Sequence, residues 1–277
     1  MKKQALRNVK ITCALVLFSI KLWAQQCPSV ILIDNPSFEG TPGMSVAPNG
    51  WIMCSSCDIL PGPYGINLPP SDGQSYVGGG SSINPYSTED IGQQLSSPLL
   101  ALINYSFSVD LANANFSPPT GLCGEIQLWG SNNSCGKDEL LWSSGNLTNT
   151  NWQTFQVSFT PTATYNYILF NASHNNLCFS SIYLLIDNMS NIQPDVAVAI
   201  GGNISCNGLF DGWAKVGYKP GPPPYTYLWN NGATVDSIGG LCPGTYRVDV
   251  TNGVGFTSCD TIVITEPLVL QANPING

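Results

Sequence analysis

The chain has 277 residues, of which only 9% are charged, with nine lysines and arginines against 17 aspartates and glutamates. Five of the nine basic residues lie before residue 22, so the rest of the chain keeps four basic residues against 17 acids, a net charge of −13. A chain this acidic lacks the electrostatic footprint of a nucleic-acid or anionic-membrane binder, which leaves neutral sugars, proteins and divalent cations as partners.

The first 24 residues have the pattern of a secretory signal peptide. Basic residues from Lys2 to Lys10 precede the apolar run ITCALVLFSI, and Ala24 stands before the expected cleavage site. Lys21 ends the apolar run well short of the roughly 20 residues that span a bilayer. We therefore expect a secreted chain, extracellular or at the cell surface, with no membrane span after cleavage.

Residues 25–193 read as a series of short strands. Apolar stretches such as YSFSVDLA, GEIQLWG, NWQTFQVSF and IYLLID are separated by Gly, Pro and Asn. So many short strands predict two packed sheets in a jelly-roll β-sandwich. The order of the stretches also resembles the secreted jelly-roll domains of Bacteroidetes surface proteins, which are similar to carbohydrate-binding modules of the galactose-binding-like kind.

This resemblance implies a structural calcium ion. In the modules that the domain resembles, an acid in the first strand and an aspartate in the last hold the ion, and the matching positions here are Glu39 and Asp187. Carboxylates and carbonyls are the ligands that calcium prefers. The alternative is that both acids accept hydrogen bonds from backbone amides near strand ends.

Sugar binding needs flat aromatic rings beside amide or carboxylate groups. Trp51 and Trp152 occupy positions typical of core residues. The better candidates stand in loop-like stretches, although each of them could also be packing: Tyr64, Tyr86, Phe116 and Trp142.

A second series of strands follows a boundary at Pro194. In LCPGTYRVDVTNGVG, residues 241–255, apolar and polar residues alternate up to Asn252-Gly253, which predicts a strand entering a tight hairpin. Similar strands with turns every 8–12 residues predict a small immunoglobulin-like sandwich over 195–267. Its aromatic strand, from Tyr225 to Trp229, is expected to face the core, with a ligand platform as the alternative.

The motifs SCNGLFDGWAKV, PPPYTYLWNNGAT, SIGGLCPGTYRVDVTNGVG and IVITEP together resemble one SprB repeat. This module recurs in giant surface adhesins of gliding-motility Bacteroidetes and in related secreted proteins. Residues 268–277 resemble the start of a further repeat, so we expect the chain to be a piece of a longer array.

Nine cysteines follow the signal segment, and disulfides are the expected state of cysteines in a secreted protein. Six of them precede residue 190, which leaves 15 possible pairings. Within the repeat we predict a Cys206–Cys259 disulfide, with Cys242 as the competing partner.

Catalytic motifs are scarce. His174 is the single histidine, no Gly-x-Ser-x-Gly is present, and pairs of acids are too common in this chain to be specific. We therefore expect a non-enzymatic surface adhesin that recognises glycans, surface polymers or other cell-surface proteins. The alternative is a carbohydrate-binding accessory region of a larger secreted polysaccharide-degrading enzyme.

Overall fold

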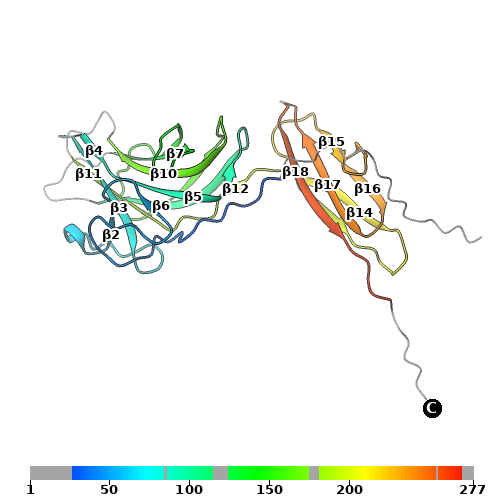
Figure 1. The fold of residues 1–277 in the computed structure, drawn as a ribbon, viewed down its shortest axis with the longest axis horizontal. Helices are drawn as coiled ribbons and strands as arrows, with labels where there is room; N and C mark the ends of the chain where they lie inside the picture. The colour runs from blue at the N-terminus through cyan, green and yellow to red at the C-terminus, as the bar shows by residue number, and fades with distance from the viewer. Residues whose placement is uncertain (1–26, 84–85, 115–123, 175–180, 254, 270–277) are drawn as a thin grey trace, which may run out of the picture. The chain divides into compact units, whose positions relative to one another are not determined.

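The computed structural model describes residues 27–83, 86–114, 124–174, 181–253 and 255–269. The chain folds into two compact units, Ser29–Asp195 and Val196–Gly277, and the second unit also takes in the residues up to Pro28 (Figure 1). We call these units the N-terminal and the C-terminal sandwich. The expected signal segment, residues 1–24, lies outside the described residues, as do residues 270–277 of the expected further repeat.

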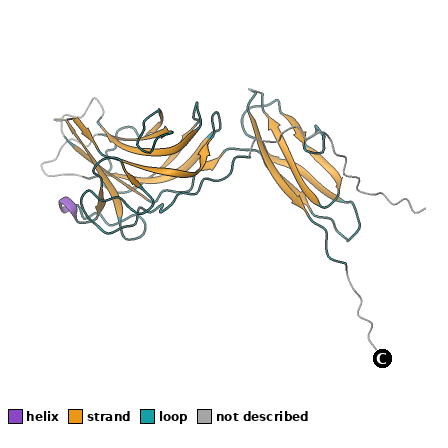
Figure 2. Ribbon diagram, viewed as in Figure 1, coloured by secondary structure: helices purple, strands orange, loops and turns teal. Residues whose placement is uncertain are grey.

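The N-terminal sandwich is a jelly roll of two antiparallel sheets (Figure 2). The first sheet contains, in spatial order, β1 (Ile52–Met53), β5 (Asp90–Leu99), β10 (Tyr165–Ser173), β7 (Glu125–Ser131) and β8 (Glu139–Ser143). The second contains β12 (Gln193–Pro194), β6 (Tyr105–Asn113), β11 (Ile182–Asp187), β3 (Tyr76–Ile83) and β2 (Asp58–Leu60), with β4 (Tyr86–Thr88) beside β3 and β9 (Gln153–Phe159) beside β6. A 3-10 turn, η1 (Pro63–Gly65), follows β2.

The core of this sandwich lies between the sheets and follows from the alternation along each strand. Leu128, Ile168 and Phe170 from the first sheet and Val109 and Leu184 from the second are 3% exposed or less. Since successive side chains of a strand point to opposite faces, the residues between them point away from this core. The outer faces of the two sheets are thereby fixed.

The C-terminal sandwich is a small immunoglobulin-like β-sandwich of two three-stranded antiparallel sheets. One contains β13 (Val198–Gly202), β14 (Gly212–Tyr218) and β16 (Ser237–Leu241), and the other contains β15 (Thr226–Trp229), β17 (Gly244–Thr251) and β18 (Thr257–Ile264). Trp229 is fully buried in the core, and Tyr225 and Tyr227 pack against it. The aromatic strand therefore serves packing, as expected.

The predicted hairpin joins β17 to β18, but its loop is longer than two residues. The last pair of the ladder is Thr251 with Thr257. Asn252 begins the connection: its backbone N–H donates to the Phe256 carbonyl, and its side-chain oxygen accepts the Phe256 N–H. The Asn-Gly pair thus begins a longer connection after the last ladder pair instead of forming a two-residue turn.

The predicted Cys206–Cys259 disulfide is wrong, because Cys259 is bonded to Cys27 and Cys206 is free and exposed. The Ile204 N–H donates to the Thr265 carbonyl, which places Cys206 beside the far end of β18. Cys259 is six residues from Thr265, or about 20 Å along a strand, whereas the Cα atoms of bridged cysteines lie within about 7 Å. Cys242, the competing candidate, is disulfide-bonded, but not to Cys206, which is free.

Candidate functional site

The outer face of the first sheet carries a row of polar and aromatic side chains on β7. Ile126 and Leu128 point into the core, so Glu125, Gln127 and Trp129 point outward, and all three are half-buried. We call these three residues, with Ser143 and Tyr167 beside them, the Trp129 face. Strands β5, β10 and β7 that form its floor lie side by side (Figure 1).

A chain of hydrogen bonds orders the Trp129 face. The Trp129 indole Nε1 donates to Gln127 Oε1 at 3.1 Å, and Gln127 Nε2 donates to Glu125 Oε1 at 2.6 Å. The Ser143 hydroxyl donates to Glu125 Oε2, also at 2.6 Å. Because each side chain holds the next, the ring and the carboxylate are preorganised rather than free to rotate.

Neighbouring strands complete and bound this face. Tyr167 on β10 shares it, two residues from Leu169, the cross-strand partner of Trp129. Further along, the 132–137 loop covers Gly92, where a Cβ atom would lie 3.0 Å from the Ser134 carbonyl oxygen. The Cys54–Cys135 disulfide anchors this loop. The face therefore has an open part over β7 and a covered part over β5.

Such a face can hold a sugar ring. An indole or phenol ring stacks on the apolar face of a pyranose, while amide and carboxylate groups pair with its hydroxyls. Trp129 was not among the candidates from the sequence. The signal for it is the alternation in GEIQLWG, which puts Glu125, Gln127 and Trp129 on one face.

Tyr64, one of the aromatic candidates, does lie in a loop and is 55% exposed. It belongs to η1 and its ring meets the Tyr183 ring edge-on, with centroids 5.7 Å apart. The Tyr183 hydroxyl in turn donates to the buried carboxylate of Asp58 at 2.5 Å. Tyr64 thus packs on Tyr183 of the second sheet, whereas the Trp129 face belongs to the first sheet.

Of the other three aromatic candidates, the structure describes the side chain of Trp142, which lies in the first sheet and not beside Tyr64. Trp142 is in strand β8, not a loop, because it pairs with the core residue Leu128 and its half-buried ring packs edge-on against Phe155. Tyr86 also lies in a strand, β4, and its side chain is not among those described. Phe116 lies outside the described residues.

The two expected calcium ligands instead accept hydrogen bonds from the backbone of one loop, residues 71–75. Asp187 is 0% exposed, and its Oδ2 accepts the backbone N–H groups of Ser71 and Asp72 at 2.7 and 3.0 Å. Glu39 Oε1 accepts the N–H of Gln74 at 2.9 Å. Burial raises the pKa of Asp187 to about 6, against the lowering effect of these backbone donors.

This donor set does not fit a calcium ion as it stands. Calcium needs six to eight oxygen ligands, and here the two carboxylates are turned toward N–H groups. Among the residues that the structure describes, no three histidine, cysteine, aspartate or glutamate side chains are grouped to hold a metal. We therefore treat the two acids as a clamp on the loop, and the calcium ion stays a prediction of the family resemblance.

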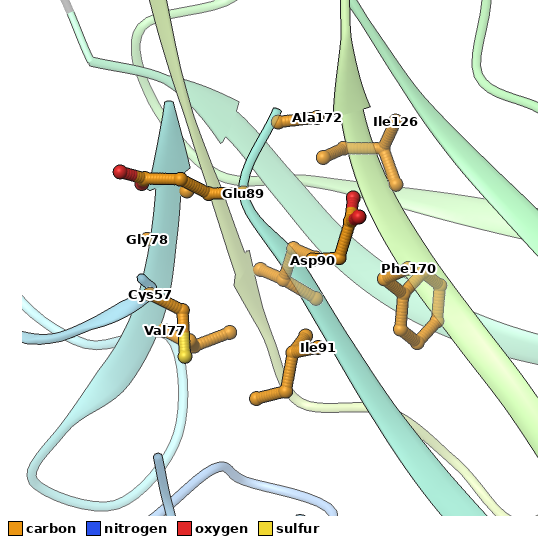
Figure 3. A pocket seen from close by; sticks show the side chains of 11 residues that line it. Cys57, Val77, Gly78, Glu89, Asp90, Ile91, Ile126, Phe170 and Ala172 are labelled. Carbon is orange, nitrogen blue, oxygen red and sulfur yellow. The ribbon is translucent and has the colours of Figure 1, made fainter. Parts of the chain in front are cut away.

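A small cavity lies between the two sheets, lined mainly by apolar side chains such as Val77, Ile91 and Ile126 (Figure 3). Burial raises the pKa of the Cys57 thiol there to about 12, so this free cysteine stays protonated and unreactive at neutral pH. The Glu89 and Asp90 carboxylates point away from each other in Figure 3. The cavity thus has no converging polar groups among the residues that line it.

His174 lies next to a serine. Its Nδ1 is 2.6 Å from the Ser81 hydroxyl. Ser81 is 3% exposed and lies inside strand β3, paired with Thr88 and Ile182. A nucleophilic serine usually sits on a sharp exposed turn, so this pair has the position of a packing contact.

In the part of the chain that the structure describes, no helix is long and apolar enough to cross a membrane.

The solved structures that resemble the chain share little sequence with it. No curated protein matches the chain. The K3 cleaved adhesin domain of Lys-gingipain from Porphyromonas gingivalis W83 is 12% identical, with a TM-score of 0.34 over 53% of this chain and 93% of that domain. A CBM4 structure is 11% identical, with a TM-score of 0.31 over 53% of this chain and 96% of that one. The arabinose-bound MgGH51 α-L-arabinofuranosidase is 16% identical, with a TM-score of 0.44 over 60% of this chain and only 27% of the enzyme.

The family comparison concerns the C-terminal sandwich alone. The SprB repeat family matches residues 202–234, from the end of β13 to the turn after β15. The resemblance expected from the sequence motifs is thereby confirmed for this segment, which carries an SprB repeat.

Proposed function

We propose that the chain is a secreted, non-enzymatic surface-binding protein whose N-terminal sandwich recognises glycans through the Trp129 face. The observation that carries this proposal is the hydrogen-bonded row from Ser143 through Glu125 and Gln127 to Trp129 on an outer sheet face. A row whose members are already ordered loses little entropy on binding. The SprB repeat supports an adhesin, since the motif resemblance is to surface adhesins.

The absence of catalysis belongs to the same proposal. Ser81 of the Ser81–His174 pair is buried inside strand β3, and the Glu89 and Asp90 carboxylates beside the cavity point away from each other. These arrangements support binding without turnover. The alternative setting, an accessory region of a polysaccharide-degrading enzyme, would use the same face.

The experiment incubates the full chain with a panel of soluble neutral polysaccharides and measures two quantities. Affinity electrophoresis should reveal retardation by at least one polysaccharide, and assays for reducing ends should find none released. Release of reducing ends by the purified chain would overturn the non-enzymatic part. Retardation that survives Trp129→Ala would overturn the assignment of the face.

A further inference from the structure

The C-terminal sandwich has an exposed tryptophan of its own. Trp213 lies on the middle strand β14 and is 43% exposed, whereas Ala214 and Val216 on the same strand point into the core. Its cross-strand partners are glycines, Gly202 on β13 and Gly239 on β16. Because both paired positions are glycines, neither carries a side chain that would block access to the indole ring.

The two glycines have different roles. A Cβ atom on Gly202 would lie 2.9 Å from Trp213 Cε2, so the ring rests directly on that backbone. A Cβ atom on Gly239 would meet nothing within 4 Å, so the space on that side is open. The result is a flat ring with a supported base and free access along the sheet.

A lysine without a carboxylate partner lies beside this ring. Lys215, two residues further along β14 on the same face, is exposed, and its Nζ lies 5.9 Å from the Trp213 ring centroid. The other basic side chains of the described residues each contact an acid: Lys137 with Asp90 at 3.1 Å, Lys219 with Asp236 at 3.9 Å and Arg247 with Asp249 at 3.0 Å. Lys215 is the one described cation with no carboxylate within 4 Å.

The charge of the chain is unevenly divided between the sandwiches. Residues 29–195 carry one basic residue against twelve acids, a net charge of −11. Residues 196–277 carry three basic residues against five acids, a net charge of −2. The acidity that argues against anionic partners thus belongs mainly to the N-terminal sandwich, and the C-terminal sandwich by itself repels an anion less.

We propose that Trp213 and Lys215 form a second binding site, specific for an anionic sugar residue of the uronate type. The pyranose ring stacks on the indole, and its carboxylate pairs with the Lys215 ammonium. The ammonium–ring contact of the free protein is a weak, exposed cation–π interaction, so the lysine can turn to the ligand at little cost. The site is separate from the Trp129 face and from its proposed function.

The test measures binding of the full chain to sodium polygalacturonate and to its fully methyl-esterified form, which keeps the sugar ring and loses the charge. We expect the charged polymer to bind at least threefold more tightly, with an affinity that falls as salt is added. Lys215→Gln should remove both the preference and the salt dependence. Trp213→Ala should weaken binding of the charged polymer at least tenfold, and Trp213→Phe should restore part of it.

Controls separate this site from the other face and from other occupants. Trp129→Ala, which removes the proposed neutral-glycan face, should keep the preference for the charged over the esterified polymer, and loss of that preference in this variant would assign it to the Trp129 face and overturn the proposal. Equal binding of both polymers, binding unaffected by Lys215→Gln, or no binding at all would overturn it as well. Sedimentation would overturn it too if the wild type self-associates and Trp213→Ala does not, because a second copy of the chain would then cover the ring. Thermal melts of each variant establish that the C-terminal sandwich is folded.

Discussion

Asp187 lies fully buried among backbone donors, and burial raises its pKa from 3.8 to about 6. Between about pH 4 and pH 6 the native state therefore holds a proton that the unfolded chain has released. The stability that the protonated carboxyl contributes is fully present below about pH 4 and is lost as the pH rises through 6. Asp110 has the opposite effect on stability. Burial alone would raise its pKa, but hydrogen bonds from Ser71, Thr154 and Asn188 lower it overall, so the stability that its carboxylate contributes is lost as the pH falls.

We expect the wild type to lose stability relative to Asp187→Asn between pH 4 and pH 6. The change should be at most about 3 kcal/mol, at about 1.4 kcal/mol per pKa unit. Denaturant unfolding of both full-length chains at several pH values measures it, and contributions such as that of Asp110 cancel in the difference. A difference that stays constant across this window would mean that the Asp187 pKa is not raised.

Calcium is tested at the same residue. The family resemblance predicts an ion between Glu39 and Asp187, whereas their hydrogen bonds to the 71–75 loop describe a clamp that needs no ion. Because the two carboxylates already accept backbone N–H groups, we expect the same melting midpoint with calcium and with chelator. Asp187→Ala should have a lower midpoint under both conditions. A midpoint that rises with calcium in the wild type and not in Asp187→Ala would establish the ion, because a ligand of the folded state stabilises by mass action.

At the scale of the element, strand β3 contains three successive glycines with different surroundings. A Cβ atom on Gly78 would collide with the Tyr183 ring and lie 2.7 Å from Leu60 Cδ1. A Cβ atom on Gly79 would lie 3.4 Å from its nearest neighbour, the Glu89 carbonyl oxygen, which is ordinary contact. The register of β3 against β2 and β11 thus requires glycine at one position and not at the next.

We therefore predict that Gly78→Ala destabilises the N-terminal sandwich by about 1–3 kcal/mol, the usual cost of overpacking. Gly79→Ala in the same strand is the matched control and should change stability much less. Urea unfolding curves of the two variants provide the comparison. Equal effects would mean that β3 pairs in another register.

Much of the element pattern could be predicted from the sequence, because alternation along a strand is a local property. The strands GTYRVDV and GEIQLWG form as expected, and the core face of the Tyr225–Trp229 strand was assigned correctly. The Trp129 face was missed for a physical reason. The alternation of β7 puts Trp129 on the same face as Glu125 and Gln127, but a tryptophan is apolar enough to be covered there, so the sequence alone does not show whether its ring is accessible.

Pairings between residues far apart in the chain could not be predicted from the sequence. Cys27 and Cys259 are 232 residues apart, and nothing in their local patterns couples them. Spacing suggested Cys206 only because it belongs to the same repeat. Trp142 gives a second example, since it stands near Gly and Asn in the sequence and yet lies in β8, paired with Leu128 of β7.

At the scale of the whole molecule, the Cys27–Cys259 disulfide closes the chain around the entire N-terminal sandwich. Both cysteines belong to the C-terminal sandwich, while residues 29–195 form the other unit. A cut between Asp195 and Val196 should therefore leave two fragments joined until the disulfide is reduced.

A protease site inserted at this junction tests the pairing. Non-reducing electrophoresis should show one band after cleavage and reducing electrophoresis two, and a non-reducing digest should contain a peptide that links Cys27 to Cys259. Cys27→Ser should destabilise the C-terminal sandwich by about 2–4 kcal/mol, and Cys206→Ser should have little effect, because Cys206 is free and exposed. A peptide linking Cys206 to Cys259 in a non-reducing digest would restore the original prediction and contradict this pairing.

Glycan recognition by the Trp129 face is the central claim for the molecule, and the affinity of matched variants tests it most directly. Isothermal titration should use the neutral polysaccharide that the wild type binds best, with Trp129→Ala, Glu125→Gln and Tyr64→Ala as full-length variants. We predict that Trp129→Ala raises the Kd at least tenfold and Glu125→Gln several-fold, while Tyr64→Ala, an exposed tyrosine in η1 that packs against the other sheet, leaves it unchanged. An unchanged Kd for Trp129→Ala with a large rise for Tyr64→Ala would contradict the account and move the site to the second sheet.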